Sequence, residues 1–155
     1  MDLDRYKLIR KKWGNHCSWA IWADSTDGLP MTDMDDISFF DDASIVEKLN
    51  PNIILLGLNI SGIIPGTFEN FHSKGGGAFK IRHATKNTPL WGAYMTDTIK
   101  DYPELEAANV RVVANNHPDF VKKNIDLLED EIQDLGSVNP VLYAFGVDAF
   151  WMLDK

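Results

Sequence analysis

The sequence feature that most constrains the fold is the apolar run Ile-Ile-Leu-Leu at residues 53–56. The run carries no charge, follows Asn-Pro-Asn and ends at Gly57, so it stands between two turn signals. A short apolar run of this kind is typical of a strand buried on both faces, as in a parallel sheet covered by helices. Leu58 and Asn59 come next, and ligands bind beyond the carboxyl ends of strands in open α/β sheets. The sequence therefore predicts a functional site near Asn59.

The remaining elements predict an α/β domain. Residues 118–135 have apolar side chains at helical spacing and precede Gly136, which indicates a helix, and residues 141–145 indicate a second buried strand. Less regular patterns predict helices over residues 3–13, 41–49 and 103–108, another helix from Pro89, and a strand over 18–23. Residues 91–99 are expected to begin helical and turn extended, and residues 110–114 could be strand or helix. Together they predict one domain, residues 1–155, with three α/β/α layers around a short, mostly parallel sheet.

Charge is distributed unevenly along the chain. The net charge of −8 argues against binding to nucleic acid through the overall electrostatic field. Residues 24–47 contain eight acids and no Lys or Arg, whereas residues 70–96 contain no acid. The second segment carries Lys74, Lys80, Arg82 and Lys86 around three glycines at residues 75–77. Such a basic, glycine-rich segment is either a DNA-phosphate contact or a solvated mobile loop.

The sequence predicts neither a metal nor a cofactor. The single cysteine, Cys17, excludes a disulfide within the chain and fits a reducing compartment. No Cys/His set has the spacing of zinc ligands, and no serine lies in a Gly-x-Ser-x-Gly motif. The sequence opens without a signal peptide and contains no apolar run of membrane-spanning length, so we expect a cytoplasmic protein without a membrane partner. Protein partners are not predicted.

Four short sequence features occur in an order that is informative about the family. They are Gly57-Leu58-Asn59, the aromatic residues Phe68 and Phe71, the segment Tyr-Met-Thr-Asp at 94–97, and, after a long helix, a strand that ends in Ala-Phe-Gly. In this order they resemble the uracil-DNA glycosylase superfamily, whose first strand ends in Gly-x-Asp-Pro or Gly-x-Asn-Pro. The resemblance runs from about residue 50 to the last residue. It implies a uracil-DNA glycosylase-like fold and excision of uracil or a related altered base by N-glycosidic hydrolysis.

The resemblance also implies roles for individual residues. Asn59 would orient a water molecule, because an amide cannot act as a general base. Phe71 or Phe68 would stack on the extruded base, and Asp97 would read its edge, with Gly57 and Leu58 beside them. Each residue also has a purely structural interpretation. Asn59 could cap the turn after its strand, the phenylalanines could pack in the core, and Asp97 could cap a helix or turn.

Three departures from the family pattern bear on activity. Ile60 stands where the family has proline, and Asp97 stands where the family has a base-reading asparagine. A carboxylate cannot donate to a carbonyl, so selectivity for uracil would change. The family's second motif, a His-Pro-Ser-like loop, would lie beyond Leu153. The chain is therefore either a shortened member or a fold kept without the chemistry. The alternatives are a non-catalytic module that binds a nucleotide, nucleic acid or protein, and an α/β enzyme for a small molecule.

Overall fold

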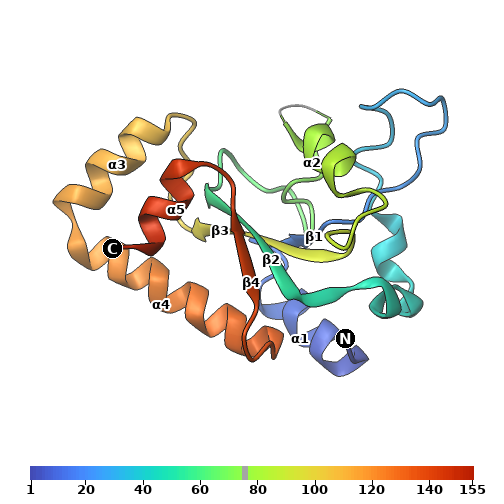
Figure 1. Ribbon diagram of the computed structural model, residues 1–155, viewed down its shortest axis with the longest axis horizontal. Coiled ribbons are helices and arrows are strands. Elements are labelled where there is room, and N and C mark those ends of the chain that lie inside the picture. Colours follow the sequence, from blue (N-terminus) through green and yellow to red (C-terminus); the bar gives the residue numbers. More distant parts are fainter. Residues whose placement is uncertain (75–76) are drawn as a thin grey trace.

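The computed structural model describes residues 1–74 and 77–155 and has an α/β fold (Figure 1). The described elements are α1 (Leu3–Lys12), β1 (Ser18–Trp19), the 3₁₀ helices η1 (Ser38–Asp41) and η2 (Ala43–Lys48), β2 (Asn50–Asn59), α2 (Ala78–Thr85), β3 (Ala93–Ile99), α3 (Ala107–Asn116), α4 (Pro118–Leu135), β4 (Val141–Ala144) and α5 (Val147–Leu153). The apolar run at 53–56 lies inside β2, as predicted from the sequence.

The sheet is mixed but mostly parallel. Its strand order is β1-β3-β2-β4 in the described part of the chain. β2 pairs in parallel with β3 and with β4, whereas the two-residue β1 pairs antiparallel with β3. The parallel register places Gly57 opposite Asp97 and Asn59 opposite Ile99. The carboxyl ends of β2 and β3 therefore lie side by side, and residues 57–59 lie near residues 97–99.

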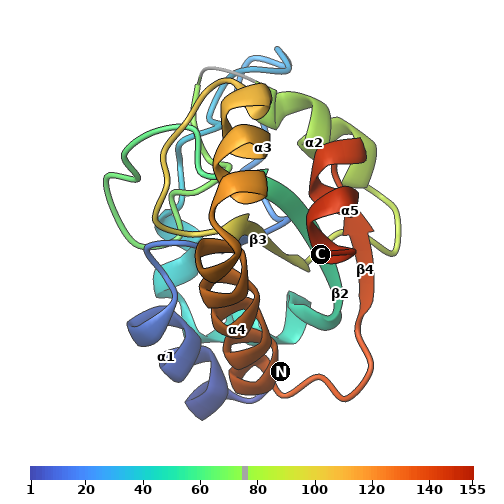
Figure 2. The same ribbon diagram turned by 90° about the vertical axis from the view of Figure 1, so that its left-hand side faces the viewer.

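Both faces of the two central strands are covered, and successive residues point to opposite faces. Ile54 and Tyr94 pack with apolar residues of α1 and with Leu135 of α4, whereas Leu55 and Met95 pack with Ala78 of α2 and the segment that follows β1. Figures 1 and 2 show α1 and α4 on one side of the sheet and α2 on the other. Burial on both faces explains why residues 53–56 alternate so little in polarity.

Several predicted boundaries are wrong, and local hydrogen bonds explain the differences. No helix begins at Pro89, because the backbone N–H and the hydroxyl of Thr88 both donate to the Thr85 carbonyl and form a turn after α2. The helix predicted at residues 103–108 begins instead at Ala107, where the Glu104 carboxylate accepts from the Glu106 N–H at 2.9 Å. Residues 110–114 belong to α3, and only Ser18–Trp19 of the predicted strand at 18–23 pairs as a strand.

The prediction that residues 141–145 form a buried strand is half right. β4 forms, but Val141, Leu142 and Tyr143 keep 53%, 40% and 47% of their surface exposed. Within the described residues, β4 pairs only with β2 and is an edge strand. An apolar run identifies a strand without giving its place in the sheet, which is why the sequence could not distinguish the exposed β4 from the buried β2.

A buried ion pair joins β3 to α4. Lys100 directly follows β3 and Glu131 lies on α4, and their side chains are 1% and 0% exposed with Nζ and Oε2 at 2.5 Å. Lys100 Nζ also donates to Thr96 Oγ1 at 2.6 Å and to the Asp97 carbonyl at 2.5 Å. Glu131 in turn accepts from the Tyr94 hydroxyl at 2.6 Å. Every ammonium N–H thus has a partner, which is the condition under which a buried pair is tolerated.

We expect Glu131→Gln to lower the free energy of unfolding by about 3–5 kcal/mol, because it leaves the Lys100 ammonium buried without a counter-charge. The double variant Lys100→Met/Glu131→Gln should cost less, since it removes the uncompensated Lys100 ammonium. Urea unfolding followed by tryptophan fluorescence measures both. Lys122→Met, which removes the exposed pair with Asp126, is the control and should leave the free energy of unfolding nearly unchanged, because solvent screens that pair. A double variant as unstable as Glu131→Gln would contradict the interpretation.

Candidate functional site

A cavity of about 500 Å³ opens at the carboxyl end of β2. It lies on the α2 side of the sheet, as the lining residues Gly77, Ala78, Lys80 and Ile81 indicate. The remaining lining residues come from the end of β2, the loop after it, β3 and the end of β4: Asn59, Ile60, Ser61, Gly62, Ile63, Ile64, Pro65, Glu69, Asn70, Phe71, Ser73, Asp97 and Phe145. This is the edge of the sheet at which the sequence predicted a site.

Asn59 is both a turn-stabilising residue and a cavity residue. Its amide nitrogen lies 2.8 Å from the carbonyl oxygens of Ile60 and Glu104 and 3.1 Å from that of Tyr102. These bonds connect the end of β2 to the segment that leads into α3. They also fix the side chain, because a flipped amide would place its oxygen against three carbonyl oxygens. The amide oxygen accepts no hydrogen bond from any described residue, so it is the side-chain atom of Asn59 that is available to a ligand or a water molecule.

Asp97 lies in the middle of β3 and caps neither a helix nor a turn. It lines the cavity although it is only 3% exposed, and Asn70 Nδ2 donates to its Oδ2 at 2.9 Å. Burial raises the pKa of Asp97 from 3.8 to about 6, although the hydrogen bond from Asn70 and the positive charge of Lys100 act in the opposite direction. The carboxyl group is therefore ionised at neutral pH but close to titration.

The absence of a side chain at Gly57 makes room for this carboxylate. A Cβ atom at Gly57 would overlap Asp97 Oδ1 and would lie 3.6 Å from Phe71 Cζ. Gly57, Phe71 and Asp97 are thus direct neighbours, although they come from β2, the loop after it and β3. The glycine predicted from the strand-end motif is required here for close packing, which is a common use of glycine.

The two predicted stacking residues lie in different places. Phe71 is partly exposed and lines the cavity, whereas Phe68 is fully buried against Tyr6 and Phe40 of the core. From that position Phe68 cannot present a ring face to a ligand. Both residues have positive φ angles, 65° for Phe68 and 66° for Phe71. A bulky residue rarely adopts this conformation, and such strain is concentrated at functional sites.

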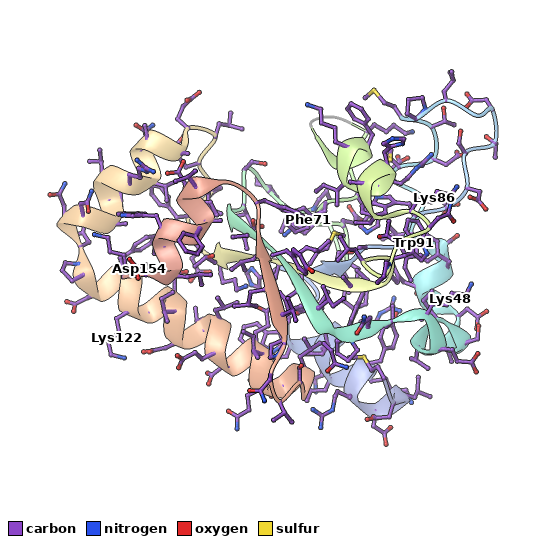
Figure 3. All side chains as sticks on the ribbon, in the orientation of Figure 1. Lys48, Phe71, Lys86, Trp91, Lys122 and Asp154 are labelled. Carbon is purple, nitrogen blue, oxygen red and sulfur yellow. The ribbon has the colours of Figure 1, made fainter. Side chains whose placement is uncertain are left out.

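The four predicted DNA-phosphate residues also separate. Lys74 pairs with Asp35 at 3.1 Å and Lys86 with Asp24 at 2.7 Å, so both contact the acidic segment, residues 24–47. Arg82 is buried and donates to the Thr32 carbonyl at 2.9 Å. Lys80 alone of the four lines the cavity; it is exposed and forms no ion pair within the described residues. In Figure 3, Phe71 lies near the centre of the molecule, whereas Lys86 lies farther out, beyond α2.

Part of the predicted basic loop is helical. Residues 78–85 form α2, where the sequence predicted only a glycine-rich loop over residues 74–86. The glycines predicted to contact phosphate lie partly outside the described residues, which omit 75 and 76. Leu58, predicted beside the substrate, packs instead with apolar residues around Ile99 and Val110.

Asn70 is the site residue that the sequence analysis missed. Its Nδ2 donates to the His16 carbonyl at 2.8 Å as well as to Asp97, so it joins the loop after β2 both to the segment after α1 and to β3. Its only signal in the sequence is its position next to Phe71. An asparagine 27 residues from its acidic partner gives no local pattern from which the contact could be predicted.

Comparison with known proteins adds no identity. No family model, curated protein or solved structure matches the chain. Within residues 1–74 and 77–155, no group of three or more His, Cys, Asp or Glu side chains could hold a metal ion. In the same residues, no helix is both long enough and apolar enough to cross a bilayer. The chemistry of the cavity must therefore be interpreted from its own residues.

That chemistry suits a planar ligand with a hydrogen-bonding edge. Phe71 supplies an aromatic side chain, Asp97 and Asn70 supply polar groups beside it, and Lys80 supplies a positive charge. Apolar walls with a few convergent polar groups, one with a perturbed pKa, are typical of a ligand site.

We expect Gly57→Ala to lower the free energy of unfolding by about 1–3 kcal/mol, because the new methyl group would overlap the Asp97 carboxylate. Thermal unfolding measures the effect. Gly62→Ala is the matched control, since nothing lies within 4 Å of its added Cβ. In an Asp97→Ala background the cost of Gly57→Ala should largely disappear. An equal cost in both backgrounds would show that another contact is responsible.

Stability should also depend on pH through Asp97. Its pKa of about 6 in the folded protein exceeds the ordinary 3.8, so the folded state binds the proton more tightly than the unfolded state. Stability should therefore rise by about 3 kcal/mol as pH falls from above 6 to below 4, at 1.4 kcal/mol per pKa unit. The difference in unfolding free energy between the wild type and Asp97→Asn, measured by urea unfolding at pH 7.5 and 4.5, isolates this contribution. A pH-independent difference would contradict it.

Proposed function

We propose that the cavity binds a nucleobase and that the protein recognises an altered base in DNA and excises it by N-glycosidic hydrolysis. One observation carries the proposal: Asn59, Phe71, Lys80 and Asp97, chosen from sequence patterns alone, line the same cavity. These residues are spread over 39 positions of the chain, and the resemblance to the uracil-DNA glycosylase superfamily assigns a role in base handling to three of them. The proposal includes a fold of that type.

The geometry supports a base held by its face and its edge. A base extruded from the helix would stack on Phe71, which neighbours both Gly57 and Asp97. Its edge would then meet the Asp97 carboxylate and the Asn70 amide oxygen. The constrained backbone of Phe71 supports this role, because the hydrogen bonds of the adjacent Asn70 hold the loop in place before a ligand arrives. Pre-organisation of this kind reduces the entropy lost on binding.

Hydrolysis would require one water molecule. Its oxygen forms a bond to C1′ of the sugar as the bond from C1′ to the base nitrogen breaks, and the bonding electron pair leaves with the base. The departing base takes up one proton, so water is consumed and a free base and an abasic sugar are formed. The amide nitrogen of Asn59 is held by backbone carbonyls, so its amide oxygen would accept a hydrogen bond from this water. Asn59 orients the water without removing its proton.

Electrostatics indicate weak contact with the DNA backbone. The net charge is −8, and two of the four predicted phosphate-binding residues are ion-paired with the acidic segment. Lys80 remains available beside the cavity. Few phosphate contacts contribute little electrostatic affinity, so we expect weak binding, and activity assays should start at low ionic strength, about 50 mM, where the remaining contact contributes most.

The decisive test is strand cleavage by alkali after incubation with labelled oligonucleotides that carry uracil, hypoxanthine or a mismatched base. We expect Phe71→Ala to reduce cleavage about 5- to 150-fold, which corresponds to the loss of one stacking contact worth about 1–3 kcal/mol. Phe39→Ala, which removes a partly buried phenylalanine outside the cavity, should stay close to the wild type. Phe71→Ala is preferable to Asn59→Ala, because loss of the Asn59 amide would also release the loop that it holds.

The same oligonucleotides separate the two classes of function. Base-dependent binding without cleavage at high protein concentration would indicate a non-catalytic binding module. The proposal would be overturned if the protein neither bound nor cleaved these oligonucleotides, or if the Phe71→Ala variant matched the wild type.

A further inference from the structure

We propose that the cavity selects bases whose exposed edge donates hydrogen bonds, with a ring N–H next to an exocyclic amino group as in guanine, over the carbonyl-rich edge of uracil. This inference rests on the proposed function, because it specifies the hydrogen-bonding edge of the altered base that the same cavity takes; guanine, which is unaltered, serves as the probe of that edge. It follows from the orientation of three side chains that internal hydrogen bonds fix before any ligand binds.

Asn70 can offer only an acceptor. Its amide group has two N–H donors, and they are used by the His16 carbonyl at 2.8 Å and by Asp97 Oδ2 at 2.9 Å. Both partners accept without ambiguity while Asp97 is ionised, so the amide cannot flip without losing both bonds. The amide oxygen is the remaining polar atom of Asn70. Asparagine usually serves as a mixed donor and acceptor, and here the donor half is already used.

Asn59 is restricted in the same way. Its amide nitrogen is surrounded by the carbonyl oxygens of Ile60, Tyr102 and Glu104, within 2.8–3.1 Å. A ligand could take that nitrogen only by breaking the bonds that hold the loop after β2. Asn59 therefore also presents an oxygen.

Asp97 adds a third acceptor beside these two. Its Oδ2 accepts from Asn70, whereas its Oδ1 lies over Gly57 and accepts no hydrogen bond from the described residues. The residue is 3% exposed, and an ionised carboxylate buried with one oxygen unpaired has a strong preference for a donor. A base stacked on the neighbouring Phe71 would bring its edge to this oxygen.

Donors are scarce among the side chains around these acceptors. Of the described side chains that line the cavity, those with an N–H or O–H donor other than the two asparagines are Ser61, Ser73 and Lys80, and all three are exposed. Glu69 adds another carboxylate to the lining. The buried Asp97 and the half-buried Asn59, Asn70 and Glu69 thus offer acceptors, whereas the side chains with free donors are exposed.

The chemistry of base edges then decides the preference. Guanine has adjacent ring N–H and amino donors that bind a carboxylate through two parallel hydrogen bonds. Uracil has one ring N–H between two carbonyls, and those carbonyls would face the acceptors of Asp97 and Asn70. A site built for one hydrogen-bonding pattern rejects the opposite pattern strongly, because buried polar groups are left unpaired. Hypoxanthine keeps the ring N–H but lacks the amino group and should bind with intermediate affinity.

The preference should depend on pH through the charges that face Asp97. On the α4 side these are Lys100, whose ammonium donates to the Asp97 carbonyl, and Glu131, which pairs with Lys100. In the cavity lining they are Glu69 and Lys80. The pKa of Asp97 is about 6. Once protonated, Asp97 can donate to a carbonyl, so uracil should gain affinity relative to guanine at acidic pH.

The test is binding of fluorescein-labelled single-stranded oligonucleotides, measured by fluorescence anisotropy at low salt. They differ at one central position, which carries guanine, uracil, hypoxanthine or no base between thymine flanks. At pH 7.5 we expect guanine to bind at least about tenfold tighter than uracil. Asp97→Asn replaces an acceptor with a group that also donates, and it should bring uracil level with guanine or ahead of it. Asp101→Asn, which removes an exposed carboxylate, is the matched control and should keep the wild-type preference.

The outcomes distinguish this inference from the proposed function. Uracil that binds as tightly as guanine, with both affinities lowered by Phe71→Ala, would leave base binding intact and overturn the edge preference alone. Equal binding of all oligonucleotides, including the abasic one, would overturn both. If Asp97→Asn does not fold, the pH dependence of binding by the wild type provides the test. The ratio of guanine to uracil affinity should fall at least about threefold between pH 7.5 and pH 5, and a constant ratio would overturn the inference.

Discussion

The buried ion pair between Lys100 and Glu131 is the constraint on which the rest of the structure depends. Two charges without access to water are tolerated only when each is fully hydrogen-bonded, and that condition fixes where α4 lies against β3. A shift of one helical turn would leave the ammonium without its counter-charge. Because Lys100 also donates to the Asp97 carbonyl, the same pair holds the backbone of the residue at the centre of the candidate site. Folding and site geometry therefore rest on one contact.

β3 divides these tasks between its two faces. Tyr94, Thr96 and Lys100 point toward α4 and form the buried polar network, whereas Met95 and Asp97 point toward α2 and the cavity. The alternation of side chains along a strand makes this separation possible. Burial is the main cause of the raised pKa of Asp97, but the two faces also interact through charge, because Lys100 lowers this pKa and Glu131 raises it. The state of the site thus depends on residues that no ligand can reach.

The sequence predicted the centre of the structure better than its periphery. An uncharged apolar run bounded by turns was enough to locate β2 and to put Asn59 at its carboxyl end, because burial on both faces leaves a local signature. The same kind of apolar run did not predict the position of β4, which is similar in composition but lies at the edge of the sheet. Lys100 and Glu131 were overlooked because charged residues are expected in solvent and their pairing is long-range. Phe68 and Phe71 could not be separated, since both belong to one loop and only the fold determines which is buried. Asn70 has no local signature.

Close packing between Gly57 and Asp97 limits how this chain can change over evolutionary time. The space that the carboxylate occupies exists only because position 57 has no side chain. A lineage could replace Asp97 with a smaller residue while it kept Gly57, and the fold would tolerate the small void. The reverse order would require a side chain at position 57 to enter occupied space. The order of substitutions is therefore constrained: Asp97 has to be replaced before Gly57 can be.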